Sequence, residues 1–204
     1  MPPMFIFKAK RKRMWELLRK NIGRHVSLPD DQYAIVESLF TFKKYKKKQF
    51  ILQEGDVCRY ETFILKGCTR TYETGPEGQE HILQFSIEEW WAGNLYSYLS
   101  EAPSTYNVDC IEDCEVLQIT KDKQETLYAK VPAMERFFRI IIQNAFIATQ
   151  NRILTSLSKS GKEKYEEFIT KYPHIEQRVP NHQIASYLGL TPQSLSRIRS
   201  QYDK

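Results

Sequence analysis

The 204-residue sequence has 41% hydrophobic and 27% charged residues and a formal net charge of +5, which is typical of a soluble globular protein and argues against disorder. No run of eighteen apolar residues exists, and the first segment lacks the apolar core and cleavage site of a secretory signal. We therefore expect a cytoplasmic protein without a membrane segment, long enough for one ordinary domain and a small second one.

The charge is distributed unevenly along the chain. Residues 1–24 carry eight Lys or Arg and one Glu, residues 25–151 carry thirteen against nineteen Asp or Glu, and residues 152–204 carry nine against five. Basic ends around an acidic middle favour a sensing or assembly body with at least one end that binds a polyanion. The KAKRKR run before Met14 is either such an arm or the solvated overhang of a helix.

The cysteines argue against a metal centre. None of the four belongs to the paired CxxC spacing that zinc and iron-sulfur sites favour, and a reducing compartment disfavours disulfides. We expect ordinary buried thiols and no metal or other cofactor. The four residues are Cys58, Cys68, Cys110 and Cys114.

Two helices are predicted before the first strand. Trp15, Leu18 and Ile22 are spaced as on one helical face within residues 14–25. A second helix is expected over residues 30–39, after the start signal SLPDD.

From residue 42 to residue 119 the pattern changes to short alternating runs separated by turns. The segment GPEG, residues 75–78, is typical of a hairpin connection between two such runs. Several short strands at this spacing indicate a sandwich or a jelly-roll barrel.

Residues 131–157 predict a long helix that is apolar nearly all round at its centre. The helix is either the centre of a single-chain core or a dimerisation helix, with one face on the barrel and the other on a second copy. We favour the dimer because a barrel covers only one side of a helix and small residues suit a close helix crossing. The expected seam consists of Met134, Phe138, Ile141, Ala145 and Ala148.

After an amphipathic helix over residues 161–172, the end of the chain has the spacing of a helix-turn-helix. Asn181 is expected to cap a first helix, Gly189 to end it in a left-handed conformation, and Thr191 to cap a second helix that starts at Pro192. Ala185 is small enough for the two helices to cross closely. A plain helical hairpin is the alternative.

The second of these helices presents hydrogen-bonding and cationic groups on its predicted outer face, as a reader of the DNA major groove needs. Gln193 and Arg197 lie one turn apart near its start and can pair with adenine and guanine, so we expect them to read bases. A motif that binds only protein is disfavoured by the +4 charge of residues 152–204. The residues expected to contact phosphates are Thr191, Ser194, Ser196 and Arg199.

The order of these parts resembles that in the Crp/Fnr family of bacterial transcription regulators. The likeness covers residues 14–204 and rests on Gly55-Asp56, FILKGCTR, GQEHILQF and the helix-turn-helix. It implies an α+β fold in three parts, and a sequence-specific DNA-binding regulator rather than an enzyme. The expected parts are N-terminal helices with a jelly-roll sensor domain over residues 1–130, a dimerisation helix over 131–158, and a helix-turn-helix domain of winged-helix type over 159–204.

The same resemblance implies the partners: double-stranded DNA, RNA polymerase, a second copy of the chain and a small-molecule effector of unknown identity. Cyclic-nucleotide-binding members hold the ligand in a cassette in which a glutamate binds the ribose and an arginine neutralises the phosphate. The stretch GNLYSYLSEAPSTY, residues 93–106, falls in this cassette and has Asn94 and Ser104 at those two positions. Because a buried phosphate without its cation loses about 2–5 kcal/mol, we expect no response to cyclic AMP.

Two interpretations of the cassette remain open: the aromatic side chains fill the barrel, or they line a pocket for an uncharged ligand. The residues of that possible effector pocket are Asn94, Tyr96, Tyr98, Ser104, Thr105 and Tyr106. The family's iron-sulfur sensors carry cysteines ahead of the barrel, and residues 1–57 have none. A cupin-like metal or ligand-binding protein is the rival function, although the barrel offers only one histidine, His81.

Overall fold

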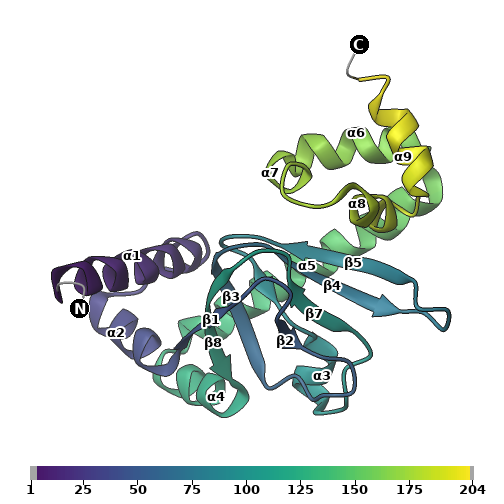
Figure 1. The fold of residues 1–204 in the computed structure, drawn as a ribbon. Coiled ribbons are helices and arrows are strands. Elements are labelled where there is room, and N and C mark those ends of the chain that lie inside the picture. The colour runs from purple at the N-terminus through teal and green to yellow at the C-terminus, as the bar shows by residue number, and fades with distance from the viewer. Residues whose placement is uncertain (1–3, 203–204) are drawn as a thin grey trace.

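The computed structural model describes residues 4–202, with side chains from Met14 onward, and it contains two sheets flanked by helices (Figure 1). One sheet has the strand order β1-β8-β3-β6 and the other β2-β7-β4-β5, and every pairing is antiparallel. The strands are β1 Thr41–Tyr45, β2 Phe50–Leu52, β3 Tyr60–Lys66, β4 Thr69–Thr74, β5 Glu80–Ser86, β6 Trp91–Ala92, β7 Asn107–Cys110 and β8 Cys114–Thr120. The helices are α1 Met4–Gly23, α2 Asp30–Leu39, α3 Leu95–Ser100, α4 Lys121–Lys130, α5 Ala133–Ser158, α6 Gly161–Lys171, α7 Pro173–Glu176, α8 Asn181–Leu188 and α9 Pro192–Arg199.

The jelly-roll expectation is confirmed. The β4–β5 hairpin turns at the predicted GPEG segment, where the Gly75 N–H donates to the Gln79 carbonyl at 2.8 Å and Gly78 takes a positive φ of 81°. Between the sheets lies a buried cluster that includes Ile64, Val108 and Val116. The two sheets enclose this cluster, and their arrangement positions the loop that contains α3.

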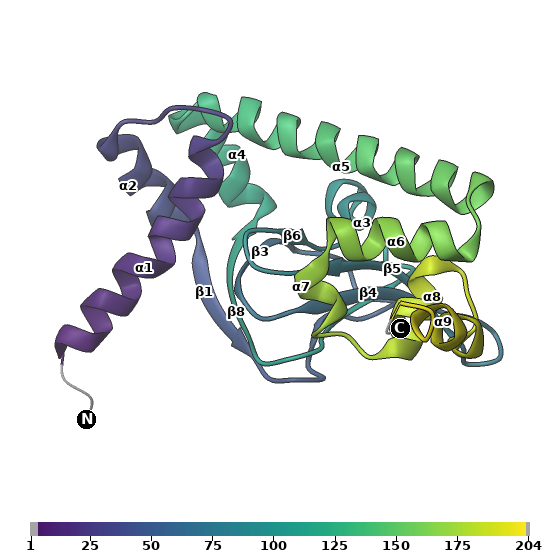
Figure 2. The same cartoon turned by 90° about the horizontal axis from the view of Figure 1, so that it is seen from above.

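A second cluster lies between the β1-β8-β3-β6 sheet and the helices α1, α2, α4 and α5. Phe63 and Leu117 from the sheet pack there with Leu18 from α1 and Phe137 from α5, and all four are almost fully buried. The long helix crosses this cover and continues beyond it, so its carboxyl half runs alongside the barrel to the C-terminal helices (Figure 2).

Three local expectations need adjustment. α1 begins at Met4, before the predicted start at residue 14, while α2 has the predicted bounds. The short helix α3 forms inside the stretch that we considered only as a loop or pocket, because the side chain of Asn94 caps it. The described part of the C-terminal region, residues 159–202, is helical and contains no wing strand. The side chains of the KAKRKR run lie outside the described residues.

Candidate nucleic-acid interface

The helix-turn-helix forms from residues that satisfy its turn and its small core. Gly189 ends α8 with a φ of 67°, and the Leu190 N–H donates to the Ala185 carbonyl at 2.9 Å. Ile184, Ala185 and Leu195 are fully buried where α8 meets α9. α8 begins after Pro180, so Asn181 is its first residue and not its cap, whereas Thr191 caps α9 as predicted.

The outer face of α9 presents the two predicted base readers together. Gln193 and Arg197 are both exposed. With Pro192, Ser196 and Ser200 they line one shallow hollow on the surface. An amide and a guanidinium one turn apart, without ion-pair partners among the described residues, can reach the edges of neighbouring bases.

Of the four predicted phosphate contacts, Thr191 and Ser196 are exposed, whereas Ser194 and Arg199 are half-buried. The Thr191 hydroxyl donates to the Ser194 hydroxyl at 2.9 Å and accepts the Ser194 N–H at 3.1 Å, so these two groups form the helix cap. Arg199 donates to Asn181 at 3.0 Å and forms an ion pair with Glu176 at 2.6 Å. The Arg199 guanidinium is thus paired within the chain and joins α9 to α7 and α8, and its predicted contact with phosphate stays a prediction.

The DNA-binding helices dock on the barrel of their own chain. Arg178, before α8, donates to Glu88 at 2.8 and 3.1 Å and to Glu112 at 2.7 Å, and these carboxylates raise its pKa further. The Ser186 hydroxyl accepts the Ile82 N–H at 3.0 Å and donates to a carbonyl of β5 at 2.8 Å. Helix α8 thus covers the open edge of strand β5.

The two cassette positions that carry charges in cyclic-nucleotide binders here bond to each other. The Asn94 amide donates to the Ser104 hydroxyl at 2.8 Å, and the Asn94 carbonyl oxygen accepts the Ser97 N–H at 3.1 Å. The Ser104 hydroxyl donates in turn to the Tyr106 carbonyl at 2.7 Å. These buried groups therefore satisfy one another's hydrogen bonds within the loop.

The aromatic residues of the cassette do not converge on one space. Tyr98 is buried, and its hydroxyl donates to Gln124 of α4 at 3.1 Å. Tyr106 is half-buried, whereas Tyr96 is 65% exposed and Thr105 is exposed. Tyr96 and Thr105 are thus exposed at the surface, apart from the buried Tyr98, and the effector pocket stays a prediction.

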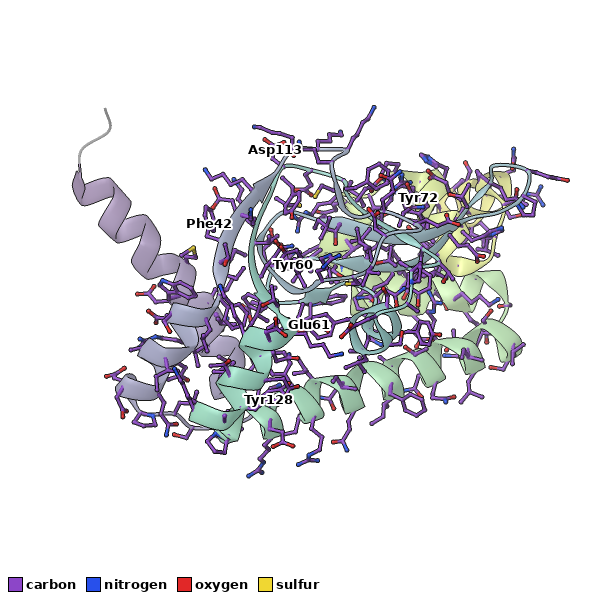
Figure 3. The ribbon with its side chains drawn as sticks, turned by 90° about the horizontal axis from the view of Figure 1, so that it is seen from below. Phe42, Tyr60, Glu61, Tyr72, Asp113 and Tyr128 are labelled. Carbon is purple, nitrogen blue, oxygen red and sulfur yellow. The ribbon has the colours of Figure 1, made fainter. Side chains whose placement is uncertain are left out.

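Next to Tyr98 lies a carboxyl group that sequence reasoning missed. Glu61, on β3, lies close to Tyr98 and faces Tyr128 of α4 (Figure 3). Burial raises the pKa of Glu61 to about 7, and burial together with this carboxylate raises the pKa of both tyrosines. Among the described residues no group donates a hydrogen bond to Glu61. The alternation of strand β3 places Glu61 on the outer face of the barrel, which does not indicate that α4 covers it.

Part of the predicted dimer seam on α5 is buried in the packing of the single chain. Met134 and Phe138 are buried against the protein's own core, and Ile141 is half-buried there. Ala145 and Ala148 are exposed as expected. The uncovered apolar residues lie further along: Ile142, Phe146, Ile147, Ile153, Leu154 and Leu157.

Neither a spanning helix nor a metal-binding group is present in the part of the chain that the structure describes. No helix there is long and apolar enough to cross a membrane. No three His, Cys, Asp or Glu side chains among those residues come together as metal ligands. The four cysteines are buried and free, and burial raises the pKa of Cys58.

Comparison with known proteins finds a matching domain family and similar regulatory proteins. Residues 42–131 match the cyclic nucleotide-binding domain family. The chain is 25% identical over 175 residues to the fumarate and nitrate reduction regulatory protein of Yersinia pestis, covering 79% of this chain and 68% of that protein. It is 24% identical over 192 residues to the regulatory protein HlyX of Actinobacillus pleuropneumoniae, covering 87% and 78% of the two chains.

Solved structures agree on the architecture. FixK2 from Bradyrhizobium japonicum superposes with a TM-score of 0.68 at 19% identity, over 79% of this chain and 83% of that one. The c-di-GMP responsive global regulator CLP of Xanthomonas campestris superposes with a TM-score of 0.70 at 9% identity, over 86% and 92%.

Proposed function

The chain belongs to the Crp/Fnr family of DNA-binding transcription regulators, and we propose that it binds an imperfectly palindromic DNA site as a homodimer. The observation that carries this proposal is the pair Gln193 and Arg197, exposed on one face of the second helix of a helix-turn-helix. Two such helices about 34 Å apart occupy successive major grooves. The relatives named as regulatory proteins support a role in transcription and not in catalysis.

The dimer forms through α5. Its exposed side carries Phe146, which is 64% exposed, and Leu157, which is 81% exposed, with Ile142 and Ile153 in the same stripe. Spacings of four, seven and four residues keep these side chains on one face of a helix, as a two-helix seam needs. The domain boundaries expected from the sequence, at residues 130 and 158, then separate the sensor domain, the dimer helix and the DNA-binding domain.

Cyclic AMP is not the effector, and the cassette works as a filled loop. Asn94 and Ser104 offer no charge to a cyclic phosphate, and their mutual hydrogen bond would have to break to admit one. The buried Tyr98 and half-buried Tyr106 occupy the neighbouring space. A contact with RNA polymerase follows from the family alone.

Binding to genomic DNA fragments, followed by anisotropy titration on a recovered site, tests the assignment. Arg197→Ala should weaken binding by about 1–3 kcal/mol and relax the preference at one base position of each half-site. Arg59→Ala removes the same charge from an exposed position of the barrel, away from α5 and α9, and serves as the control. Unchanged affinity and preference in the Arg197 variant would contradict the base-reading role.

A further inference from the structure

A run of lysines on the barrel has no part in the helix-turn-helix. Five of the six residues from 43 to 48 are lysines, within a middle segment that is otherwise acidic. All five are exposed: Lys43 and Lys44 on β1, and Lys46, Lys47 and Lys48 in the turn that leads to β2.

Ordinary structural roles account for only part of this run. Strand β1 is the edge of its sheet, where lysines prevent pairing with other chains, and Lys44 also pairs with Glu115 at 3.4 Å. Lys46 pairs with Asp113 at 2.7 Å. Lys47 and Lys48 lie outside the strand, and within the described residues neither forms an ion pair.

The turn is fixed in place although these two side chains are free. The backbone N–H of Lys47 donates to Asp113 at 2.9 Å, and that of Lys48 donates to the Cys110 carbonyl at 2.7 Å. Two ammonium groups are thus held on a backbone that is already ordered. Binding a polyanion here costs little further ordering, and it requires no existing ion pair to break.

The turn also borders the DNA-binding domain. Asp113, which binds the turn, directly follows Glu112, and Glu112 accepts a hydrogen bond from Arg178 of that domain at 2.7 Å. Figure 3 shows Asp113 at one end of the barrel, and in Figure 2 both β1 and the helices α8 and α9 lie on the side away from α5, with α8 and α9 further toward the carboxyl end of α5.

We propose that Lys47 and Lys48 bind the phosphate backbone of DNA that flanks the site read by α9. The proposal rests on the DNA binding proposed above. Lysine suits this role because it binds phosphates as a point charge without reading bases. DNA is favoured over an acidic protein because DNA held by α9 must pass the domain that this turn borders.

The test compares a duplex of about 22 base pairs, which spans both half-sites, with one of about 42 that extends roughly one helical turn further on each side. The variant is K47Q/K48N; asparagine suits position 48 because Lys48 has a φ of 69°, in the left-handed region that asparagine tolerates. The matched control, K123Q/K130Q, removes the same charge from exposed positions of α4, at the far end of the barrel (Figure 1).

Wild type and control should bind the longer duplex more tightly than the shorter one, and the variant should lose this gain. On the longer duplex, the slope of log K against log salt should become shallower by about 0.9 for each phosphate that the variant no longer neutralises, up to about 3.6 for four such phosphates in a dimer. All three proteins should bind the shorter duplex equally.

Three other results would overturn the inference or its premise. A variant that keeps the full gain from flanking DNA shows that the turn does not contact it. A variant with unchanged DNA binding that fails to support transcription by purified RNA polymerase assigns the turn to an acidic protein surface instead. Absence of salt-dependent binding of wild type to either duplex refutes the proposed function itself, before the flanking contact is in question.

Discussion

Replacing Glu61 by Gln should stabilise the folded protein at pH 8 and leave its stability unchanged near pH 4. The Glu61 carboxyl lies between β3 and α4 beside two tyrosines, and burial raises its pKa from 4.5 to about 7. An amide of nearly the same size carries no charge at any pH. The substitution therefore removes the cost of burying a carboxylate while it keeps the packing.

The sign and size of the effect follow from the pKa of Glu61 in the unfolded state, 4.5, and in the folded state, about 7. Between pH 4.5 and 7 the folded state keeps the proton on Glu61 while the unfolded state releases it, so the wild-type free energy of unfolding falls as the pH rises through this window. Above pH 7 the full difference applies, which is at most about 3 kcal/mol because Glu61 is half-buried and partly reached by solvent. For a chain of this length the melting temperature of the variant should then be higher by up to about 12 °C.

Thermal and urea unfolding of both proteins at pH 4, 6 and 8 measure this difference. Glu125→Gln, an exposed carboxyl on neighbouring α4, is the control and should change stability little at any of these pH values. A gain for Glu61→Gln that is the same at pH 4 and pH 8 would show that packing and not ionisation is responsible. No gain at pH 8 would show that the carboxylate is solvated.

Three further substitutions test the other contacts. Arg178→Ala should cost about 2 kcal/mol and release the DNA-binding helices from the barrel, which hydrogen exchange of α8 would report as faster exchange. Phe146→Glu should dissociate the dimer in sedimentation, whereas Asn144→Glu on the opposite side of α5 should not. Asn94→Ala should lower the free energy of unfolding by about 1–2 kcal/mol, because it removes both the α3 cap and the bond to Ser104, and equal urea midpoints would refute this.

The parts of the fold that follow from nearby residues were predictable. Gly189 and Thr191 determine the turn of the helix-turn-helix within a few positions, so spacing alone identified it. The apolar run of α5 likewise marked a long helix. What the run could not reveal was which face the barrel uses, because that depends on Phe63 and Leu117, far away in the sequence.

The roles that were missed depend on contacts between distant residues. Arg199 has a side chain of the type that contacts phosphates, but its ion pair with Glu176 joins two helices. No pattern near Arg178 indicates its role, because its partners, Glu88 and Glu112, precede it by 90 and 66 positions. A cation's role depends on whether a carboxylate is already within reach, and spacing along the chain carries no such information.

The structure of the cassette depends both on nearby residues and on contacts between residues further apart. Sequence comparison could place Asn94 and Ser104 where a charged pair is needed, but not decide between a neutral pocket and a filled loop. The direct bond between them, together with the cap that Asn94 provides to α3, supports the proposal of a filled loop. The two side chains are short and neutral and bond to each other, so contacts within the chain hold the start of α3 in place.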